Sequence, residues 1–279
     1  KLAGHARVTA VSRQIREIEP PALYNLTELQ KDANNYYGMT AGKSLEIAQR
    51  LYEKKLISYP RTAGRFLPRD VYDKLPRIME KILNRKEFRP YVRSMGINIF
   101  DLPDKVVDEG QAAEHHAIII TDTYPEGLNR EEMQLYMMII GRMLEAFSEK
   151  CVKDVTSIML ECAGSLFTVK GSVTKSAGWR AVFGEKEDGE DNTALPAMQD
   201  GDSLQLSGIE LLEKQTKPKP LHTESSLLSS METAGKELEN ADLKASMKDT
   251  GIGTPATRAA IIETLFSRQY IIREKKNLV

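Results

Sequence analysis

The stretch Leu56-Ile57-Ser58-Tyr59-Pro60-Arg61-Thr62 follows a segment with a clear helical pattern, Thr40 to Lys55. Thr40 is a residue type that commonly caps a helix N-terminus. Pro60 favours an extended backbone just ahead of it, so the chain should leave this helix stretched through Tyr59. Residues two apart in an extended chain project to the same side. The phenol of Tyr59 and the guanidinium of Arg61 are therefore expected to face one target together.

The charge around this stretch favours an anionic target. Between residues 43 and 69 only Glu46 and Glu53 are acidic, whereas the basic residues are Lys43, Arg50, Lys54, Lys55, Arg61, Arg65 and Arg69. The whole chain has a net charge of −1, so this is a local basic segment in a neutral protein. Such a segment is typical of a surface that meets phosphates. Pattern alone also permits a tyrosine half-buried after a helix with a solvated basic face.

Four blocks of sequence, in order, resemble the type IA DNA topoisomerases, of the topoisomerase III kind. The blocks are Ala48–Glu53 continuing into Leu56–Thr62, Glu114–Ile119, Gly178–Val182 and Gly251–Arg258. The first is similar to the family's active-site signature and the second to its histidine-containing block. The third resembles a short strand segment, and the fourth resembles the family's glycine-rich block. The four blocks extend across most of the chain.

The resemblance implies roles for three residues. Tyr59 would be the nucleophile that takes the 5′ phosphate of a cleaved DNA strand and leaves a 3′ hydroxyl. Arg61 would stabilise the charge that develops on the phosphate oxygens, although it could instead be a surface ion-pair partner. His115 would donate a hydrogen bond near the scissile phosphate, whereas the adjacent His116 should point to the opposite face of an extended segment. A pair of loop histidines with no such role is the alternative.

DNA contacts are expected at two further places. Thr254 can cap a helix that begins at a proline, and a helix N-terminus binds phosphate readily. The residues expected to contact DNA there and on the helix before Tyr59 are Gly251, Gly253, Thr254, Arg258, Lys43 and Arg50. A well-capped helix without a ligand fits the same pattern.

Two positions depart from the family pattern. After Arg61-Thr62 the family usually has an acidic residue or glycine and then serine, but here the chain reads Ala63-Gly64. The histidine block usually ends in Pro-Thr, but here Ile120 stands before Thr121. Any polar contact made by the usual residues is absent, and the geometry of the site is expected to differ locally.

Composition describes an ordinary globular chain. Of its residues, 41% are hydrophobic and 28% are charged, which is typical of globular proteins. Its length of 279 residues predicts two or three domains. No apolar run is long enough for a membrane helix, and Cys151 and Cys162 fit a cytoplasmic protein with reduced thiols. No Cys/His spacing predicts a metal site in this chain. The dense acidic run Glu185–Asp191 has the composition of a solvated loop.

The chain is interpreted as a piece of a longer protein. The resemblance implies an N-terminal Toprim domain that carries a catalytic glutamate and binds Mg²⁺ through its carboxylates, and nothing here matches that domain. Single-stranded DNA and this Toprim domain are the expected partners, and no membrane is.

The pattern of elements predicts an α+β multidomain fold. Alternating strands are expected in 1–21 and 151–213, helices in 22–150, and helices again in 214–279. The resemblance makes these a β-rich gate domain, an inserted helical domain bearing the tyrosine, and part of a helical DNA-binding base. Individual predictions include a capping box at Thr27, strands at Gly178–Phe183 and Tyr270–Ile272, and apolar helix faces that contain Tyr52 and Met133.

Two functions remain in competition from the sequence. The first is a topoisomerase fragment, which implies transient cleavage of one DNA strand, strand passage and religation without ATP. The second is a single-stranded DNA-binding or gate module with no activity of its own. A tyrosine relaxase or recombinase is excluded, because the metal-binding histidine triad of the former and the arginine and histidine order of the latter do not occur.

Overall fold

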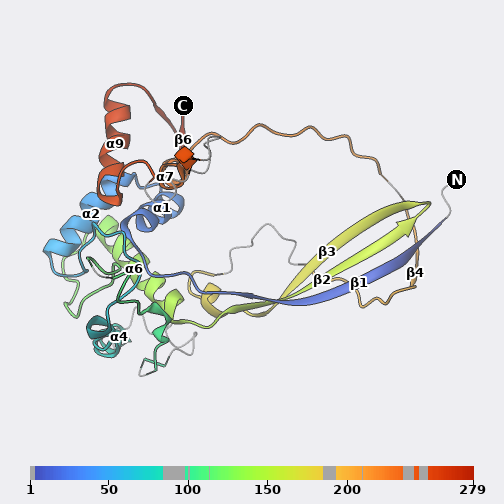
Figure 1. Cartoon of the computed structure of the whole chain (residues 1–279), viewed down its shortest axis with the longest axis horizontal. Coiled ribbons are helices and arrows are strands. Elements are labelled where there is room, and N and C mark those ends of the chain that lie inside the picture. The colour runs from blue at the N-terminus through green and yellow to red at the C-terminus, as the bar shows by residue number, and fades with distance from the viewer. Residues whose placement is uncertain are drawn as a thin grey trace. The chain divides into compact units, whose positions relative to one another are not determined.

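The computed structural model of the chain describes residues 4–83, 98–99, 101–112, 114–184, 193–208, 210–234, 242–244 and 251–279. Contacts between residues divide the chain into two compact units (Figure 1). The sheet unit consists of Lys1–Pro20 and Ser148–Pro218. The helical unit consists of Pro21–Phe147 and Lys219–Val279, so the sheet unit interrupts it in the sequence.

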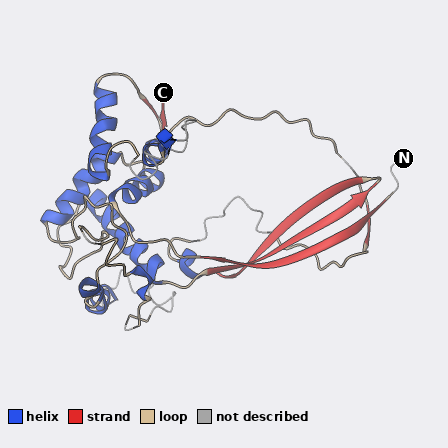
Figure 2. Cartoon of the chain, in the orientation of Figure 1, coloured by secondary structure: helices blue, strands red, loops and turns tan. Residues whose placement is uncertain are grey.

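The sheet unit is built on four antiparallel strands in the order β3-β2-β1-β4, drawn in red in Figure 2. Their bounds are β1 His5–Ile18, β2 Cys151–Cys162, β3 Ser165–Ser176 and β4 Ser203–Gln205. Strands β2 and β3 are joined by Ala163 and Gly164, which both have positive φ angles, of 50° and 80°. Two such residues form the tight turn whose twist matches that of paired strands. The alternating pattern predicted these strands, and the structure extends each of the longer ones.

The predicted strand at Gly178–Phe183 is wrong. The structure has a 3-10 helix there, η2, Gly178–Ala181. Gly178 has a φ of +51°, and a Cβ at this position would lie 2.3 Å from the carbonyl oxygen of Lys150. The Trp179 side chain donates from Nε1 to the Ile18 carbonyl oxygen at 3.1 Å. The glycine therefore turns the chain against the start of β2 instead of extending it.

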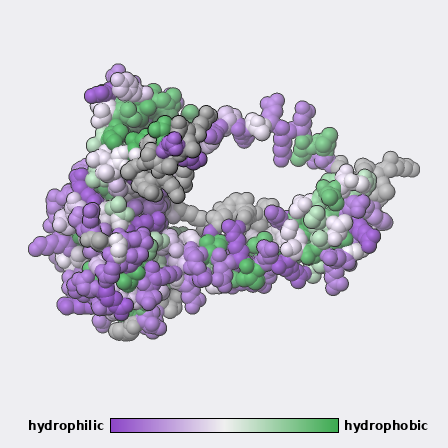
Figure 3. Space-filling view, viewed as in Figure 1, coloured by the Kyte–Doolittle hydropathy of each residue, from purple (hydrophilic) through white to green (hydrophobic). Residues whose placement is uncertain are grey.

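Much of the sheet surface is apolar although it is exposed. Figure 3 shows hydrophobic residues among hydrophilic ones on the visible part of the sheet. On β3 the exposed apolar side chains are Leu166, Phe167, Val169 and Val173. Single exposed apolar residues are normal, and they place little constraint on function.

The helical unit contains the helices and a two-stranded hairpin (Figure 2). The bounds are α1 Leu26–Tyr37, α2 Ala41–Glu53, α3 Arg69–Tyr72, α4 Leu75–Leu83, η1 Asp104–Val106, α6 Arg130–Phe147, α7 Glu224–Glu232, α9 Pro255–Ser267, β5 Arg273–Glu274 and β6 Asn277–Leu278. The break between α3 and α4 falls just ahead of Pro76, as the sequence predicted.

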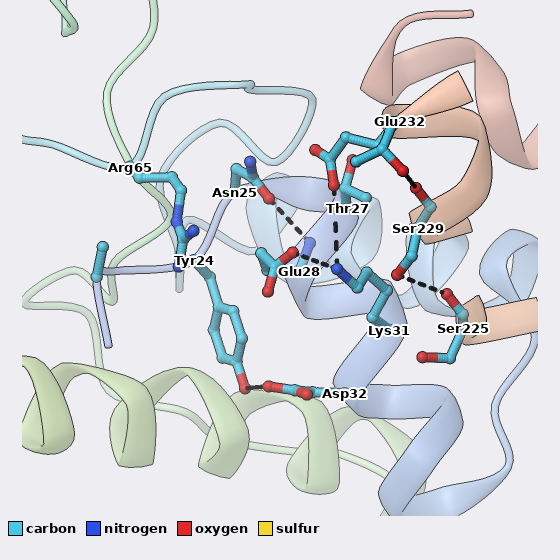
Figure 4. A network of polar contacts seen from close by, with 12 residues as sticks. Tyr24, Asn25, Thr27, Glu28, Lys31, Asp32, Arg65, Ser225, Ser229 and Glu232 are labelled. Atoms are coloured by element: carbon cyan, nitrogen blue, oxygen red, sulfur yellow. Dashed lines mark hydrogen bonds and ion pairs between the residues drawn. The ribbon is translucent and has the colours of Figure 1, made fainter. Parts of the chain in front are cut away.

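Capping residues fix where these helices begin. Thr40 accepts the Lys43 amide at 3.1 Å, so the predicted cap of α2 is confirmed. At the start of α6, Asn129 accepts the Glu132 amide at 2.9 Å. The predicted capping box at Thr27 is wrong, because Asn25 caps α1 by accepting the Glu28 amide at 2.8 Å (Figure 4). Thr27 is fully buried inside the helix instead.

The buried faces of α2 and α6 differ from the predicted stripes. On α2 the buried residues are Ala41, Ser44, Ile47, Ala48 and Leu51. Tyr52, predicted to share this face, is 39% exposed. Helix α6 is buried over most of its circumference, and only its first turn reaches solvent at Met133, which is 36% exposed. A helix buried on most sides has no single stripe that periodicity can identify.

The C-terminal piece packs on α1 and α2. A small core joins Ala41 of α2 to Leu228, Met231, Ala259 and Ile262 of α7 and α9. Glu224, at the first position of α7, accepts the Ala41 amide at 2.7 Å and so satisfies the N-terminus of α2. Lys31 of α1 bridges Glu28 at 2.6 Å and Glu232 of α7 at 3.9 Å (Figure 4). Residues 219–279, which the sequence separates from 22–150, thus join the tyrosine-bearing helices in one unit.

Several predictions fall near or outside the described residues. The predicted strand Tyr270–Ile272 is displaced: Tyr270 is exposed, and pairing begins where Ile272 exchanges two backbone hydrogen bonds with Val279. The acidic run Glu185–Asp191 and most of the helical segment near Leu243 lie outside the described residues. None of the described helices has the length and apolar character needed to cross a membrane.

Candidate active site

Helix α2 ends in a turn that reverses the chain toward Tyr59. Lys55 has a φ of 59°, a left-handed conformation that is uncommon outside glycine. Its amide donates to the Tyr52 carbonyl oxygen at 2.8 Å, and the Leu56 amide donates to the Leu51 carbonyl oxygen at 2.9 Å. These are the two hydrogen bonds of a Schellman motif. Leu51 and Leu56 occupy the two positions of that motif that commonly carry apolar side chains.

Beyond this turn the chain runs beside the histidine block. The Ser58 amide donates to the Ile119 carbonyl oxygen at 2.9 Å, and the Ser58 hydroxyl donates to the Ala117 carbonyl oxygen at 3.0 Å. Ile57 and Ile120 form an antiparallel bridge, and both are buried. Two segments about sixty residues apart in sequence are therefore held side by side at Tyr59. Ile120, a departure from the family pattern, serves here as a core residue.

The Tyr59 ring lies close to two other rings. Its centroid is 4.7 Å from that of His115, with 51° between the planes. It is 5.6 Å from that of Tyr52, at 76°, which is an edge-to-face arrangement. Tyr59 is half-buried, and His115 is exposed. The structure thus brings together two of the three residues to which the sequence assigned catalytic roles.

His116 is turned away from this group. Its Nδ1 lies 2.7 Å from the carbonyl oxygen of Ala117, and the side chain is half-buried. The structure therefore places His115, not His116, against Tyr59. This outcome agrees with the opposite projection expected for adjacent residues in an extended segment.

The buried residue Thr62 holds the histidine block in place through a hydrogen bond. It is 1% exposed, and its hydroxyl donates to the His115 carbonyl oxygen at 2.9 Å. The Thr62 hydroxyl oxygen in turn accepts the Gly64 amide at 2.9 Å. A Cβ on Gly64 would lie 2.3 Å from the His115 carbonyl oxygen, so this position has room only for glycine.

Arg61 points its charge at solvent. It is exposed, and no hydrogen-bond or ion-pair partner for it occurs among the residues that the structure describes. Arg65, four residues on, differs because its Nε donates to the Leu23 carbonyl oxygen at 3.3 Å. An unpaired guanidinium two residues from a tyrosine is able to clamp an anion with its planar fork of donors.

Lys43 and Arg50 lie on α2 but hold acidic partners. Lys43 pairs with Glu131 at 3.1 Å, and Arg50 pairs with Glu132 at 3.0 Å and also with Glu46. Glu132 accepts from Lys54 at 2.9 Å and from the Asn129 amide at 3.1 Å. The hydrogen bond from Lys54 is the largest of the influences that lower the pKa of Glu132 to about 2. These cations are therefore compensated within the helical unit.

The glycine-rich block Gly251–Arg258 forms a tight turn into α9. Thr254 is the N-cap of α9 and Pro255 takes its first position, as predicted, and Thr257 completes a reciprocal cap with Thr254. Gly251 has a φ of +60°, and a Cβ there would lie 2.5 Å from the Met231 carbonyl oxygen. The close backbone approach that the glycine permits is thus to α7.

Arg258 is a buried residue. It is 4% exposed, its Nη1 donates to the Thr27 hydroxyl at 3.1 Å, and its Nε donates to the Ile252 carbonyl oxygen at 3.2 Å. Burial lowers the pKa of its guanidinium, and the nearby charge of Glu232 opposes that shift. In this structure Arg258 joins the turn before α9 to α1, and it lies apart from any exposed surface.

A buried polar network joins Tyr24, which lies beside the histidine block, to α1 and α6. The Tyr24 hydroxyl donates to Asp32 at 2.8 Å (Figure 4). Arg142 pairs with Asp32 at 2.7 Å, and its guanidinium lies 4.2 Å from the centre of the Tyr24 ring. Burial raises the pKa of the Tyr24 phenol well above its ordinary value, so this tyrosine stays neutral. The neighbouring backbone of Tyr24 accepts the Ile118 amide at 2.8 Å and so supports the histidine block.

Metal binding by these residues is not supported. Within the described parts of the chain, no three His, Cys, Asp or Glu side chains come together to hold an ion. Sequence reasoning missed three contributors to the site, namely Tyr52, Ser58 and Thr62. The signal for Tyr52 was its spacing of seven residues from Tyr59. This spacing brings the two rings together only if the chain reverses after α2.

Comparison with known proteins gives a consistent result. A sequence profile described as DNA topoisomerase matches residues 1–279. DNA topoisomerase 3 of Bacillus subtilis is 36% identical over 282 residues, covering 97% of this chain and 38% of that protein. DNA topoisomerase 1 of Bacillus anthracis is 35% identical over 269 residues, covering 95% of this chain and 31% of that protein. The chain thus spans about a third of the length of these relatives.

A solved structure has the same fold. The full-length topoisomerase I from Thermotoga maritima matches 99% of this chain and 42% of its own, with a TM-score of 0.69. Its sequence identity to this chain is 24%. At that identity the likeness supports the fold alone.

Proposed function

The chain belongs to the family of DNA topoisomerases, and on this premise we propose that the whole protein is a type IA enzyme of the topoisomerase III kind. It opens one strand of DNA, passes another strand through the gap and reseals the break without ATP. A cytoplasmic location and single-stranded DNA as the cleaved substrate belong to the same proposal. The observation that carries it is the position of Tyr59, which has His115 against its ring and the unpaired Arg61 two residues away.

Tyr59 is the proposed nucleophile. Its phenolic oxygen attacks the phosphorus, the bond from phosphorus to the 3′ oxygen breaks, and a 5′-phosphotyrosine ester forms. Overall, the phenolic proton is transferred to the departing 3′ oxygen, which becomes a hydroxyl. The ester retains the energy of the broken phosphodiester, so the reverse attack by that hydroxyl reseals the strand. A free phenol is a weak nucleophile at neutral pH, so it requires cationic or basic neighbours.

Arg61 and His115 are the neighbours that this chain supplies. Arg61 is proposed to bind the phosphate oxygens, whose negative charge shifts as the reaction proceeds. His115 is proposed to donate a hydrogen bond to the phosphate from a ring already placed against Tyr59. The hydrogen bonds of Thr62 and Ser58 to the histidine segment support this placement, since they fix the backbone at His115 and at Ala117.

The α9 N-terminus is a proposed contact for the DNA backbone. Thr254 is exposed there at the N-terminus of a 13-residue helix, whose dipole favours an anion. Gly251, Gly253 and Arg258 act in this proposal by holding the turn against α7 and α1. Lys43 and Arg50 contact phosphates only if they exchange their present acidic partners, Glu131 and Glu132, for DNA.

Mg²⁺ is the cofactor implied for this family, but the residues described here do not fit it. No cluster of acidic, histidine or cysteine ligands occurs among them, so no step of the reaction is derived through the ion. We propose that an N-terminal Toprim domain of the same protein carries the ion and the groups that transfer the proton.

A non-catalytic gate or single-stranded DNA-binding module is the second candidate. Its support is that the chain covers only about a third of the length of its relatives. Both candidates predict that the chain binds single-stranded DNA better than duplex, with affinity that falls as salt rises. Affinity that is flat in salt would contradict phosphate contacts in either case.

The deciding experiment is Tyr59→Phe in the full-length protein. We expect the variant to lose the covalent DNA adduct completely while its affinity for single-stranded DNA remains within about twofold, because only the attacking oxygen is removed. The adduct is measured by denaturing gel with an end-labelled oligonucleotide. An adduct in the Tyr59→Phe variant removes Tyr59 from this role, and no adduct in the unsubstituted protein favours the gate module.

A further inference from the structure

Tyr52 occupies an unusual place for a large aromatic residue. It lies in the last turn of α2, outside the buried face of that helix, and is 39% exposed. Its neighbour Leu51 is completely buried and supplies the packing of this turn. The Tyr52 ring therefore contributes little to the core, and its principal described ring contact is with Tyr59.

The backbone brings the two tyrosines together, but the backbone hydrogen bonds do not fix the direction of the Tyr59 phenol. The turn at Lys55 fixes the chain before Tyr59, and the Ser58 hydrogen bonds to the histidine segment fix it beside Tyr59. In the described chain the Tyr59 hydroxyl has no hydrogen-bond partner. The direction of the phenol therefore depends on the rings that lie against it.

We propose that Tyr52 is a positioning residue that acts through its ring edge to aim the Tyr59 phenol, together with the ring of His115. The centroid separation of 5.6 Å and the angle of 76° lie within the favoured range for edge-to-face pairs. Tyr52 itself takes no part in the chemistry. This inference rests on the proposed role of Tyr59 as the nucleophile.

The expected effect on rate follows from the strength of such a contact. An edge-to-face pair biases a ring's orientation by a factor of about 3 to 10. A reaction that requires the phenolic oxygen close to the phosphorus is slowed by the same factor when the bias is lost. Binding of DNA through phosphate contacts does not depend on this orientation.

The kinetic test uses the full-length protein and single-turnover cleavage of an oligonucleotide. Tyr52→Ala should slow cleavage about 3- to 10-fold without a change in DNA affinity, and Tyr52→Phe should restore the rate because it keeps the ring. Tyr37→Ala is the matched control, because Tyr37 is 44% exposed in the last turn of α1. Equal rates for Tyr52→Ala and the unsubstituted protein overturn the proposal. So does a Tyr52→Phe variant as slow as Tyr52→Ala, or an equal loss in Tyr37→Ala.

A second measurement does not depend on activity. The 279-residue chain is labelled with fluorotyrosine, and the Tyr59 resonance is identified by its loss in Tyr59→Phe. Tyr52→Ala should shift this resonance, whereas Tyr52→Phe and Tyr37→Ala should leave it in place. If the Tyr59 resonance does not shift in Tyr52→Ala, the inference is wrong, whatever the cleavage rate of this variant. A covalent adduct that persists in full-length Tyr59→Phe contradicts the proposed function instead, whatever the spectrum shows.

Discussion

At the scale of single residues, the carbonyl oxygen of His115 organises the site. It accepts the Thr62 hydroxyl at 2.9 Å and lies where a side chain at Gly64 would project. The departure Ala63-Gly64 from the family pattern thus coincides with a close backbone contact. A side chain at position 64 would require the histidine segment to shift, because its Cβ would lie 2.3 Å from the His115 carbonyl oxygen.

Arg61 provides the sharpest prediction at this scale. In the full-length protein, Arg61→Ala should reduce the single-turnover cleavage rate about 100-fold, because it removes a donor from the charge that develops on the phosphate. Affinity for single-stranded DNA should fall much less, since a single exposed cation contributes little to ground-state binding. The two quantities are measured by quenched-flow cleavage and by fluorescence anisotropy.

The matched control is Arg69→Ala. Arg69 is also exposed, but it pairs with Asp73 on α3. This control should leave the cleavage rate unchanged. Equal losses of rate and affinity in Arg61→Ala would mean that Arg61 acts as an ordinary binding residue and has no special role in the transition state.

At the scale of elements, the end of α2 carries a conformational cost. Lys55 adopts a left-handed φ of 59°, which is unfavourable for a residue with a Cβ. Lys55→Gly should therefore raise the free energy of unfolding by about 1 kcal/mol, provided that the added freedom of glycine in the unfolded chain does not cancel the gain. Urea denaturation of the chain measures the effect. Lys54→Gly, at the C-cap with a φ of −73°, should show no gain, and a gain in Lys54→Gly alone would contradict this account.

The contact between α2 and α6 should be sensitive to acid. Hydrogen bonds from Lys54, Asn129 and Arg50 lower the pKa of Glu132 from 4.5 to about 2. Because the folded-state pKa is the lower one, this carboxylate stabilises the fold fully above pH 4.5, and the stabilisation is lost as pH falls toward 2. We expect the loss to be about 1–2 kcal/mol, after allowance for the partial exposure of both cations.

Glu132→Gln measures this contribution. It should be less stable than the unsubstituted chain at neutral pH, and the difference should disappear toward pH 2. Glu131→Gln is the control, because the side chain of Glu131 is 48% exposed, and it should be nearly neutral at every pH. A Glu132→Gln penalty that persists unchanged at pH 2 would show that shape, not charge, sets the role of this residue.

Local signals in the sequence were sufficient for some elements. Thr40 and Pro255 mark helix starts through their own side chains, so α2 and α9 could be placed without knowledge of the rest of the fold. Alternation likewise identified β2 and β3. The pairing of Tyr59 with His115 was expected only from family resemblance, because no pattern within the chain links residues that far apart.

Other features depend on contacts that a sequence pattern does not contain. Gly178 turns because Lys150 and Glu149 lie against it, whereas the alternation in its neighbourhood indicated a strand. Arg258 was expected at a DNA surface, but Thr27, which is 231 residues away, receives its hydrogen bond. Such long-range partners decide whether a charged residue lies at a surface or in the interior.

At the scale of the molecule, the division of labour between domains is testable. The chain alone should not relax negatively supercoiled DNA at any Mg²⁺ concentration, because phosphoryl transfer requires charge neutralisation and proton transfer that Tyr59, Arg61 and His115 do not complete. An agarose-gel assay over a magnesium series checks this, with and without an added Toprim domain. Relaxation by the chain alone that is lost in Tyr59→Phe would contradict the proposed division.

The discontinuity of the helical unit affects how a nascent chain can fold. When the ribosome has reached Pro218, it has synthesised α1 and α2 but not α7 and α9. In the folded chain, α7 and α9 pack on Ala41, and Glu224 of α7 accepts the amide at the α2 N-terminus. At ordinary elongation rates the remaining sixty or so residues take roughly 3 to 12 s. During that interval Ala41 and the N-terminus of α2 remain uncovered, while the sheet unit, which is complete by Pro218, is able to fold first. The order of synthesis thus makes the tyrosine-bearing unit the last to close and the one most in need of chaperone protection.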